Sequence, residues 1–269
     1  MTGRRFSSQP DWGGEVSAVR KGARPPLRSW LPLAAALALA TALILGRGRD
    51  VQRDILTADP ELLLARPDLR QVALDGGRAV YLTRCAACHG DTGRGNGFPG
   101  VPDLTDDDHL YGTGTVAEIE DIVRFGIRAG NKRGWNLAVM PAYASAVPDK
   151  AETLPPQTPR QVEDLTQFLL SFTGRATDQS AATRGKDLFQ HGAGCWDCHS
   201  SDAGGDAAIG APALSDNVWL YGRTHDDIYR SIAFGRAGYS PAFGAILKPI
   251  EIREVAAYVA SLAPGGARR

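Results

Sequence analysis

The sequence is poor in sulfur and has no excess of charge of either sign. Its 269 residues include only four cysteines and two methionines, and 30 basic side chains balance 30 acidic ones. A formal net charge of zero gives no electrostatic attraction for a polyanion, which argues against nucleic acid as a partner. All four cysteines lie in two short motifs, so none remains for a conventional disulfide framework.

One long apolar run, WLPLAAALALATALIL, occupies residues 30–45. A helix needs about 17 to 25 residues to span a bilayer, so the run with its two flanking residues predicts a short transmembrane anchor at 29–46. Six basic residues precede the run, which favours a cytoplasmic tail at 1–28 and places the rest of the chain in the periplasm. A cleaved signal peptide is the alternative, but no clean small-residue cleavage site follows the run.

The rest of the chain contains an internal repeat. CAACHG at 85–90 recurs as CWDCHS at 195–200, a displacement of 110 positions. VPDLTDDDHLYG at 101–112 recurs as APALSDNVWLYG at 211–222 with the same displacement. A constant displacement over two separate blocks indicates that one domain has been duplicated.

Each copy begins and ends in a pattern typical of a helix. In the first copy, Thr158 can cap a helix with Pro159 at its first position, and apolar residues then recur at helical spacing. We therefore expect an all-α fold, with two tandem domains behind one N-terminal transmembrane helix. The expected divisions are a periplasmic linker at 47–72, a first domain at 73–174, a short linker at 175–182 and a second domain at 183–264. The first helices of the two copies are expected at 77–84 and 184–190.

Both copies carry the pattern Cys-x-x-Cys-His. Two thiols at this spacing can form thioether bonds to the two vinyl groups of one haem, and the adjacent imidazole can bind the iron. The residues concerned are Cys85, Cys88 and His89 in the first copy and Cys195, Cys198 and His199 in the second. Zinc ribbons place their two cysteine pairs about 15 to 20 residues apart, whereas more than a whole domain separates the two pairs of this chain. A zinc site is therefore disfavoured. A thioredoxin-like redox pair is disfavoured by the histidine that follows both motifs. The sequence predicts two covalently attached haem c groups with iron.

The two copies resemble class I cytochrome c domains. Pro102 and Pro212 each fall 13 residues after the motif histidine, where a proline loop of that family orients the proximal imidazole. Gly77 and Tyr81 match the family's first helix, in which a glycine permits close crossing with the last helix. In the second copy the motif begins two residues later relative to Gly185, so its connection to the helix must differ.

The resemblance implies a methionine as distal iron ligand, and here the copies differ. Met140, followed by proline, matches in the first copy and is the only methionine besides Met1. We therefore expect His89 and Met140 to bind the first iron, and the first haem to have the higher potential because methionine ligation raises it. The second copy has Ser240 at that place, so its haem is expected to be five-coordinate or to recruit another side chain. The candidates are His225, His191, Tyr239 and Lys248, while His109, which takes the place of Trp219, is expected to pack in the core.

The anchor, the two domains and the repeated LYG blocks together resemble subunit III of cbb3-type haem-copper oxidases, the FixP-like proteins, over residues 50–264. The resemblance implies an electron carrier, not an enzyme on its own, that passes single electrons from a periplasmic cytochrome towards an oxidase in the inner membrane. Three alternatives remain at this stage. The chain could serve a periplasmic dehydrogenase, act as a haem enzyme or gas-binding protein through an open second haem, or be a zinc-stabilised module.

Overall fold

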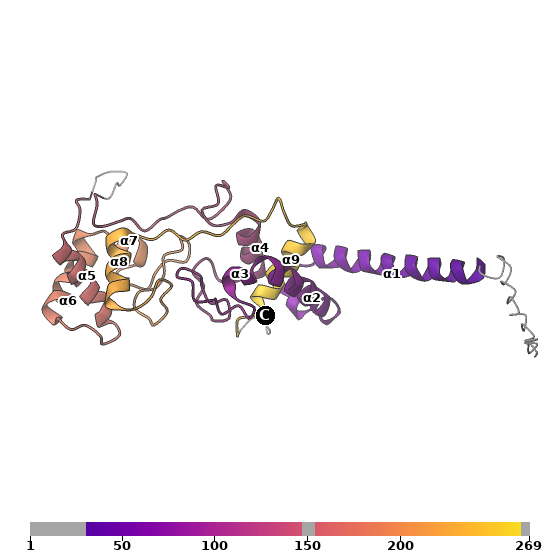
Figure 1. The fold of residues 1–269 in the computed structure, drawn as a ribbon, viewed down its shortest axis with the longest axis horizontal. Helices are drawn as coiled ribbons and strands as arrows, with labels where there is room; N and C mark the ends of the chain where they lie inside the picture. Colours follow the sequence, from indigo (N-terminus) through magenta and orange to yellow (C-terminus); the bar gives the residue numbers. More distant parts are fainter. Residues whose placement is uncertain (1–30, 147–153, 265–269) are drawn as a thin grey trace, which may run out of the picture. The chain divides into compact units, whose positions relative to one another are not determined.

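The computed structural model describes residues 31–146 and 154–264 (Figure 1). The expected cytoplasmic tail and the first two residues of the expected anchor lie outside this range. The chain divides into two compact units, residues 1–48 and 49–269, and each is considered by itself. Over the described ranges the secondary structure consists of helices and isolated bridges without strands, which confirms the all-α expectation.

Helix α1 (Leu31–Thr57) is long and apolar enough to cross a membrane, and its apolar stretch is not buried. The expected anchor is therefore helical, but the helix continues past residue 46. Near its end Ile55 is fully buried with Leu63 and Leu69, and the short helix η2 (Pro60–Ala65) follows at once. Segment 47–72, expected to be a linker, is thus mostly helical and contributes to the core of the second unit.

The remaining helices are short, as expected for a loop-rich chain. They are α2 (Pro67–Arg84), α3 (Ala86–His89), α4 (Val116–Phe125), α5 (Pro159–Ser171), α6 (Gln179–Asp187), η3 (Leu188–Gly192), α7 (Trp196–His199), α8 (His225–Phe234) and α9 (Pro249–Ala260). Thr158 caps α5 and Pro159 is its first residue, as the sequence predicted. Both α2 and α6 begin earlier than expected, because Pro67 can start one and Asp178 caps the other.

The first helix of each copy packs against the last helix of the other copy. Figure 1 shows α9, from the end of the chain, beside α2, and α5 beside α6. A Cβ on Gly77 of α2 would collide with the backbone carbonyl of Glu254 in α9, and a Cβ on Gly185 of α6 would collide with that of Asp164 in α5. Both crossings therefore need glycine, and both join residues from different copies.

Two short segments cross between the copies and complete the exchange. Ile127, just after α4, exchanges two backbone hydrogen bonds with Ser240, with N···O distances of 2.9 and 3.0 Å. Met140 exchanges two with Arg236, just after α8, both at 3.1 Å. The segment that follows α4 therefore pairs with the end of α8, and the segment that follows α8 pairs with the end of α4.

The packing builds two modules, each from segments of both copies, whereas each of the expected domains at 73–174 and 183–264 holds one copy along the sequence. The first module comprises residues 49–127 and 240–262, and the second comprises 140–146 and 154–236. The physical reason lies in segment 175–182, the expected linker between the copies. It contains the turn that joins α5 to α6 inside the second module, and elements joined by a short turn pack as neighbours.

Polar contacts hold each exchanged helix in its module. In the first module, Arg253 of α9 donates to Glu120 of α4 at 2.8 Å and to the carbonyl of Ala58 at 3.1 Å. In the second, Arg184 of α6 donates two hydrogen bonds to Asp164 of α5, at 2.9 and 2.6 Å. The carboxylates of Glu120 and Asp164 are mostly buried. Removing the arginine of either pair would therefore leave a buried carboxylate without a compensating charge.

The contact between α2 and α9 predicts a dependence of stability on pH. Glu254 lies against Gly76, and burial, with a smaller contribution from Glu251, raises its pKa to about 7 from the ordinary 4.5. The native state then binds more protons than the unfolded state between these values, so the free energy of unfolding falls as pH rises from about 4.5 through 7.

Replacing Glu254 by glutamine should remove this dependence and stabilise the protein at pH 8 by about 1 to 2 kcal/mol, a value reduced for partial solvent screening. Thermal unfolding at about pH 5.5 and pH 8 measures the effect, with Asp121→Asn on the exposed face of α4 as the control. An equal fall between the two pH values in Glu254→Gln and the parent would contradict the assignment.

Candidate cofactor sites

The first motif lies where α2 ends. The backbone N–H of Cys85 donates to the carbonyl of Tyr81 at 2.8 Å, and the short helix α3 then carries Cys88 and His89. The hydroxyl of Tyr81, which is fully buried, donates to the carbonyl of Gly90 at 2.7 Å and fixes the end of α3. Gly90 has a φ of 72°, which favours glycine and lets the chain turn sharply after the histidine.

The second motif is reached by a different route. The two extra residues between α6 and the motif are accommodated by the π-helical turn η3, which follows α6, and by Gly194. Helix α7 then carries Cys198 and His199. His199 is buried, and its Nδ1 lies 2.9 Å from the carbonyl of Pro212, the proline that the sequence assigned to this role. This bond leaves Nε2 as the nitrogen available to a metal.

The corresponding contact in the first module is looser. Burial lowers the pKa of His89, and the carbonyl of Pro102 partly offsets that change. Nevertheless, Nδ1 of His89 is buried without a full hydrogen bond. Burial likewise lowers the pKa of His199, so both imidazoles are neutral and able to bind iron.

One continuous cavity is lined by both motifs. Its walls are mainly apolar and include the following residues from the two modules: Cys85, Cys88, His89, Leu104, Val123, Val259, Met140, Leu165, Leu169, Cys195, Cys198, His199, Leu214 and Ile232. Burial raises the pKa of Cys85 to about 11 and that of Cys195 to about 12, so the cavity disfavours a charged thiolate at both positions. Across the described residues, acidic, cysteine and histidine side chains form no cluster of three that could hold a bare metal ion. The single imidazole and the two cysteines of each motif suit an iron porphyrin, because the porphyrin ring itself supplies four ligands to the iron.

Met140 lies in the second module, not with the first motif. It packs in the same cluster as Cys195 and Trp219. The neighbouring Tyr143 is buried in the same cluster as Cys195, and its backbone N–H donates to the carbonyl of Ile232 at 3.1 Å. The segment that carries Met140 crosses to the other module, so Met140 lies beside the motif of Cys195, whereas the sequence suggested the haem of His89 as its partner.

Ser240 takes the corresponding place in the first module. Three residues later, the backbone N–H of Phe243 donates to the carbonyl of Val123 at 2.9 Å, just as Tyr143 does to Ile232. Val123 packs with Cys85. Ser240 thus lies in the module of the first motif and Met140 in that of the second, whereas the sequence suggested the reverse.

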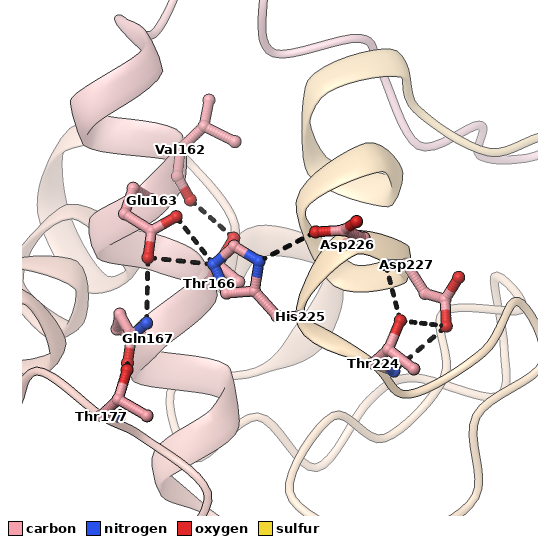
Figure 2. Close-up of polar contacts among 9 residues, drawn as sticks. All are labelled: Val162, Glu163, Thr166, Gln167, Thr177, Thr224, His225, Asp226 and Asp227. Carbon is pink, nitrogen blue, oxygen red and sulfur yellow. Dashed lines mark hydrogen bonds and ion pairs between the residues drawn. The ribbon is translucent and has the colours of Figure 1, made fainter.

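Three of the four substitute ligands suggested by the sequence, all but Tyr239, lie outside the lining of the cavity. Figure 2 shows His225 at the start of α8, with Nε2 2.8 and 3.0 Å from the carboxylate oxygens of Glu163 in α5 and Nδ1 3.2 Å from Asp226. His191 is exposed beside Asp187. Both histidines belong to the outer surface of the second module. The other two candidates, Tyr239 and Lys248, are exposed, and Lys248 occupies the N-cap position of α9.

Two loops interlock between the motifs, a feature that the sequence analysis missed. Tyr111 packs onto Gly210, and its repeat equivalent Tyr221 packs onto Gly100. Hydrogen bonds reinforce this pairing: Gly100 N–H donates to Leu220 at 2.6 Å, and Gly112 N–H donates to Ala207 at 3.1 Å. The LYG blocks in both copies carried the signal, because each contains a tyrosine whose partner glycine lies in the opposite copy.

The helices and the paired Cys-x-x-Cys-His motifs, with His199 buried and His89 partly buried, define a c-type cytochrome. The cytochrome c family matches the chain at residues 74–173 and 182–263.

The relatives narrow the assignment further. The cbb3-type cytochrome c oxidase subunit CcoP of Cereibacter sphaeroides is 32% identical over 215 residues, which cover 80% of this chain and 70% of the relative. CcoP of Rhodobacter capsulatus is 35% identical over 223 residues, covering 80% and 71%. The FixP subunit of Azorhizobium caulinodans is 34% identical over 200 residues, covering 74% and 63%. The chain belongs to the CcoP/FixP family. It is a membrane-anchored electron carrier with covalently bound haem c, as the sequence predicted.

Proposed function

We propose that the chain holds two haem c groups and passes single electrons from a periplasmic cytochrome to the core subunits of a cbb3-type oxidase. The observation that supports this most strongly is the continuous cavity, which is lined by the cysteines and histidine of both motifs. Each haem would supply an iron that gains and loses one electron. The relatives are named as subunits of such oxidases, which supports the choice of acceptor.

In this proposal the protein residues hold the two groups rigidly. Cys85 and Cys88 would hold the first haem, Cys195 and Cys198 the second, and His89 and His199 would bind the irons. Met140 would supply its sulfur to the iron of the second haem. Its segment is held by backbone hydrogen bonds on both sides, which limits movement of the ligand when the iron changes charge.

The interlocked loops are suited to transfer between the two haems. Tyr111 and Tyr221 each pack on a glycine of the opposite loop, and Arg128 donates to the Tyr111 hydroxyl at 2.7 Å. Arg236 lies over the ring of Tyr221, with its guanidinium carbon 4.6 Å from the ring centre. These contacts tie the surroundings of one motif to those of the other. Helix α1 would anchor the chain in the inner membrane with both haems in the periplasm, as the basic residues before the apolar run favour.

Intact mass and oxygen uptake test this proposal. The mature chain should carry two haems, Cys85→Ala/Cys88→Ala and Cys195→Ala/Cys198→Ala should each carry one, and the fourfold variant none. In membranes, each double variant should lose most oxygen uptake driven by a reduced periplasmic cytochrome. Uptake driven by an artificial reductant of the oxidase core should remain and serves as the control. Full cytochrome-driven uptake without the chain, or uptake lost only with a dehydrogenase substrate, would contradict the oxidase assignment.

A further inference from the structure

We infer that the haem of the first motif has an open distal position at Ser240, which binds a small neutral diatomic ligand of the carbon monoxide class. The inference rests on the proposed function only in requiring a haem at Cys85, Cys88 and His89. The open position is inferred at the first haem, whereas the order of the sequence suggested the second.

The first step is the register of the two distal segments. Met140 pairs with Arg236 two residues after α8, and Ser240 pairs with Ile127 two residues after α4. Each pair is joined by two reciprocal backbone hydrogen bonds, so the two segments occupy equivalent places. Ser240 therefore stands in the first module where the thioether of Met140 stands in the second.

Second, within the described part of the chain, no other side chain takes the place of the missing methionine sulfur at Ser240. A neutral serine hydroxyl is a poor ligand for haem iron. His109 lies on the loop of Pro102, which belongs to the proximal side, and its ring packs against Gly114. Tyr239, next to Ser240, lines the cavity, but it is 69% exposed. His191 and His225 are held by carboxylates of the other module.

The third step is the chemistry of the walls. Val123, Ile127 and Phe243 line the cavity in the first module together with Ser240. The nearest charged group on the crossing segments is Arg128, and its donors are used by Gly238, by Ala138 at 3.0 Å and by the Tyr111 hydroxyl at 2.7 Å. Apolar side chains around Ser240, with the Arg128 donors already hydrogen-bonded, favour a neutral ligand over an anion.

Carbon monoxide is the probe that tests this inference. Added to the reduced full-length protein, it should change the absorption of one haem. The change should persist in Cys195→Ala/Cys198→Ala and be lost in Cys85→Ala/Cys88→Ala. Ser240→Met should supply the missing sulfur and reduce the amplitude at least tenfold, whereas Ser180→Met, on the exposed start of α6, should leave it unchanged.

The results separate this inference from the proposed function. A chain with two haems that binds no carbon monoxide, or binds it at the haem of Cys195 and Cys198, would overturn the open first site and leave the electron carrier intact. A chain whose first motif carries no haem would overturn the proposed function itself. Should Ser240→Met fail to fold, the two cysteine variants still decide which haem binds the ligand.

Discussion

Removal of α9 is expected to destroy the first haem site and to leave the second one intact. A chain that ends at Lys248 lacks Ile252 and Val255, which are buried in the first module. It also lacks Tyr258, whose ring packs against that of Tyr81 with centroids 5.3 Å apart. The two aliphatic side chains alone contribute about 3 to 6 kcal/mol, a large part of the about 5 to 15 kcal/mol that stabilises a domain.

Limited proteolysis and absorption spectroscopy would measure this effect. Segment 67–125 should be cleaved at least tenfold faster in the truncated chain, whereas segment 154–236 should stay protected. The absorption band typical of methionine-ligated haem should remain, because Met140 and α5 are both present. A chain that ends at Leu262, after α9, is the matched control. Loss of protection in 154–236 with protection retained in 67–125 would instead support two contiguous domains.

The second large effect is expected at the iron of the second motif when Met140 is replaced by alanine. Methionine ligation raises the potential of a haem relative to nitrogenous ligation. Axial ligands set haem potentials over about 0.8 V, so loss of the sulfur should lower the potential by an amount on the order of 100 mV. The second haem is accordingly expected to be the higher-potential one in the parent protein.

Redox titration of single-haem chains assigns the change. Met140→Ala should lower the potential in the Cys85→Ala/Cys88→Ala background, which retains only the second haem. It should have little effect in the Cys195→Ala/Cys198→Ala background. The reverse pattern would mean that Met140 serves the first haem, as the order of the sequence suggests.

The motifs and their local surroundings could be predicted from sequence because their geometry is local. Cysteines and histidine within five positions hold one haem, and Pro212, 13 residues later, reaches His199 as expected. Thr158 and Pro159 likewise start α5 as predicted, because capping depends on neighbouring residues alone. The anchor followed from the length of an apolar run.

The exchange of segments could not be predicted in this way, because the two copies present equivalent surfaces. Gly77 and Gly185 both mark a helix that must cross another closely, and α5 and α9 both offer a suitable partner. The sequence pattern therefore predicts that a first helix packs against a last helix, but it does not say whether the two come from the same copy. The short turn after α5 decides the matter, since it brings α5 against α6 and leaves α9 for α2.

The central claim is that Met140 binds the haem held by Cys195 and Cys198. Selective carbon-13 labelling of methionine methyl groups tests it directly, because the protein has only Met1 and Met140. In the reduced protein one methyl signal should be strongly shifted by the haem ring current. Its nuclear Overhauser contacts should run to the haem of Cys195 and Cys198, and they should be unchanged in Cys85→Ala/Cys88→Ala. Contacts to the haem of Cys85 and Cys88 would contradict the exchanged arrangement.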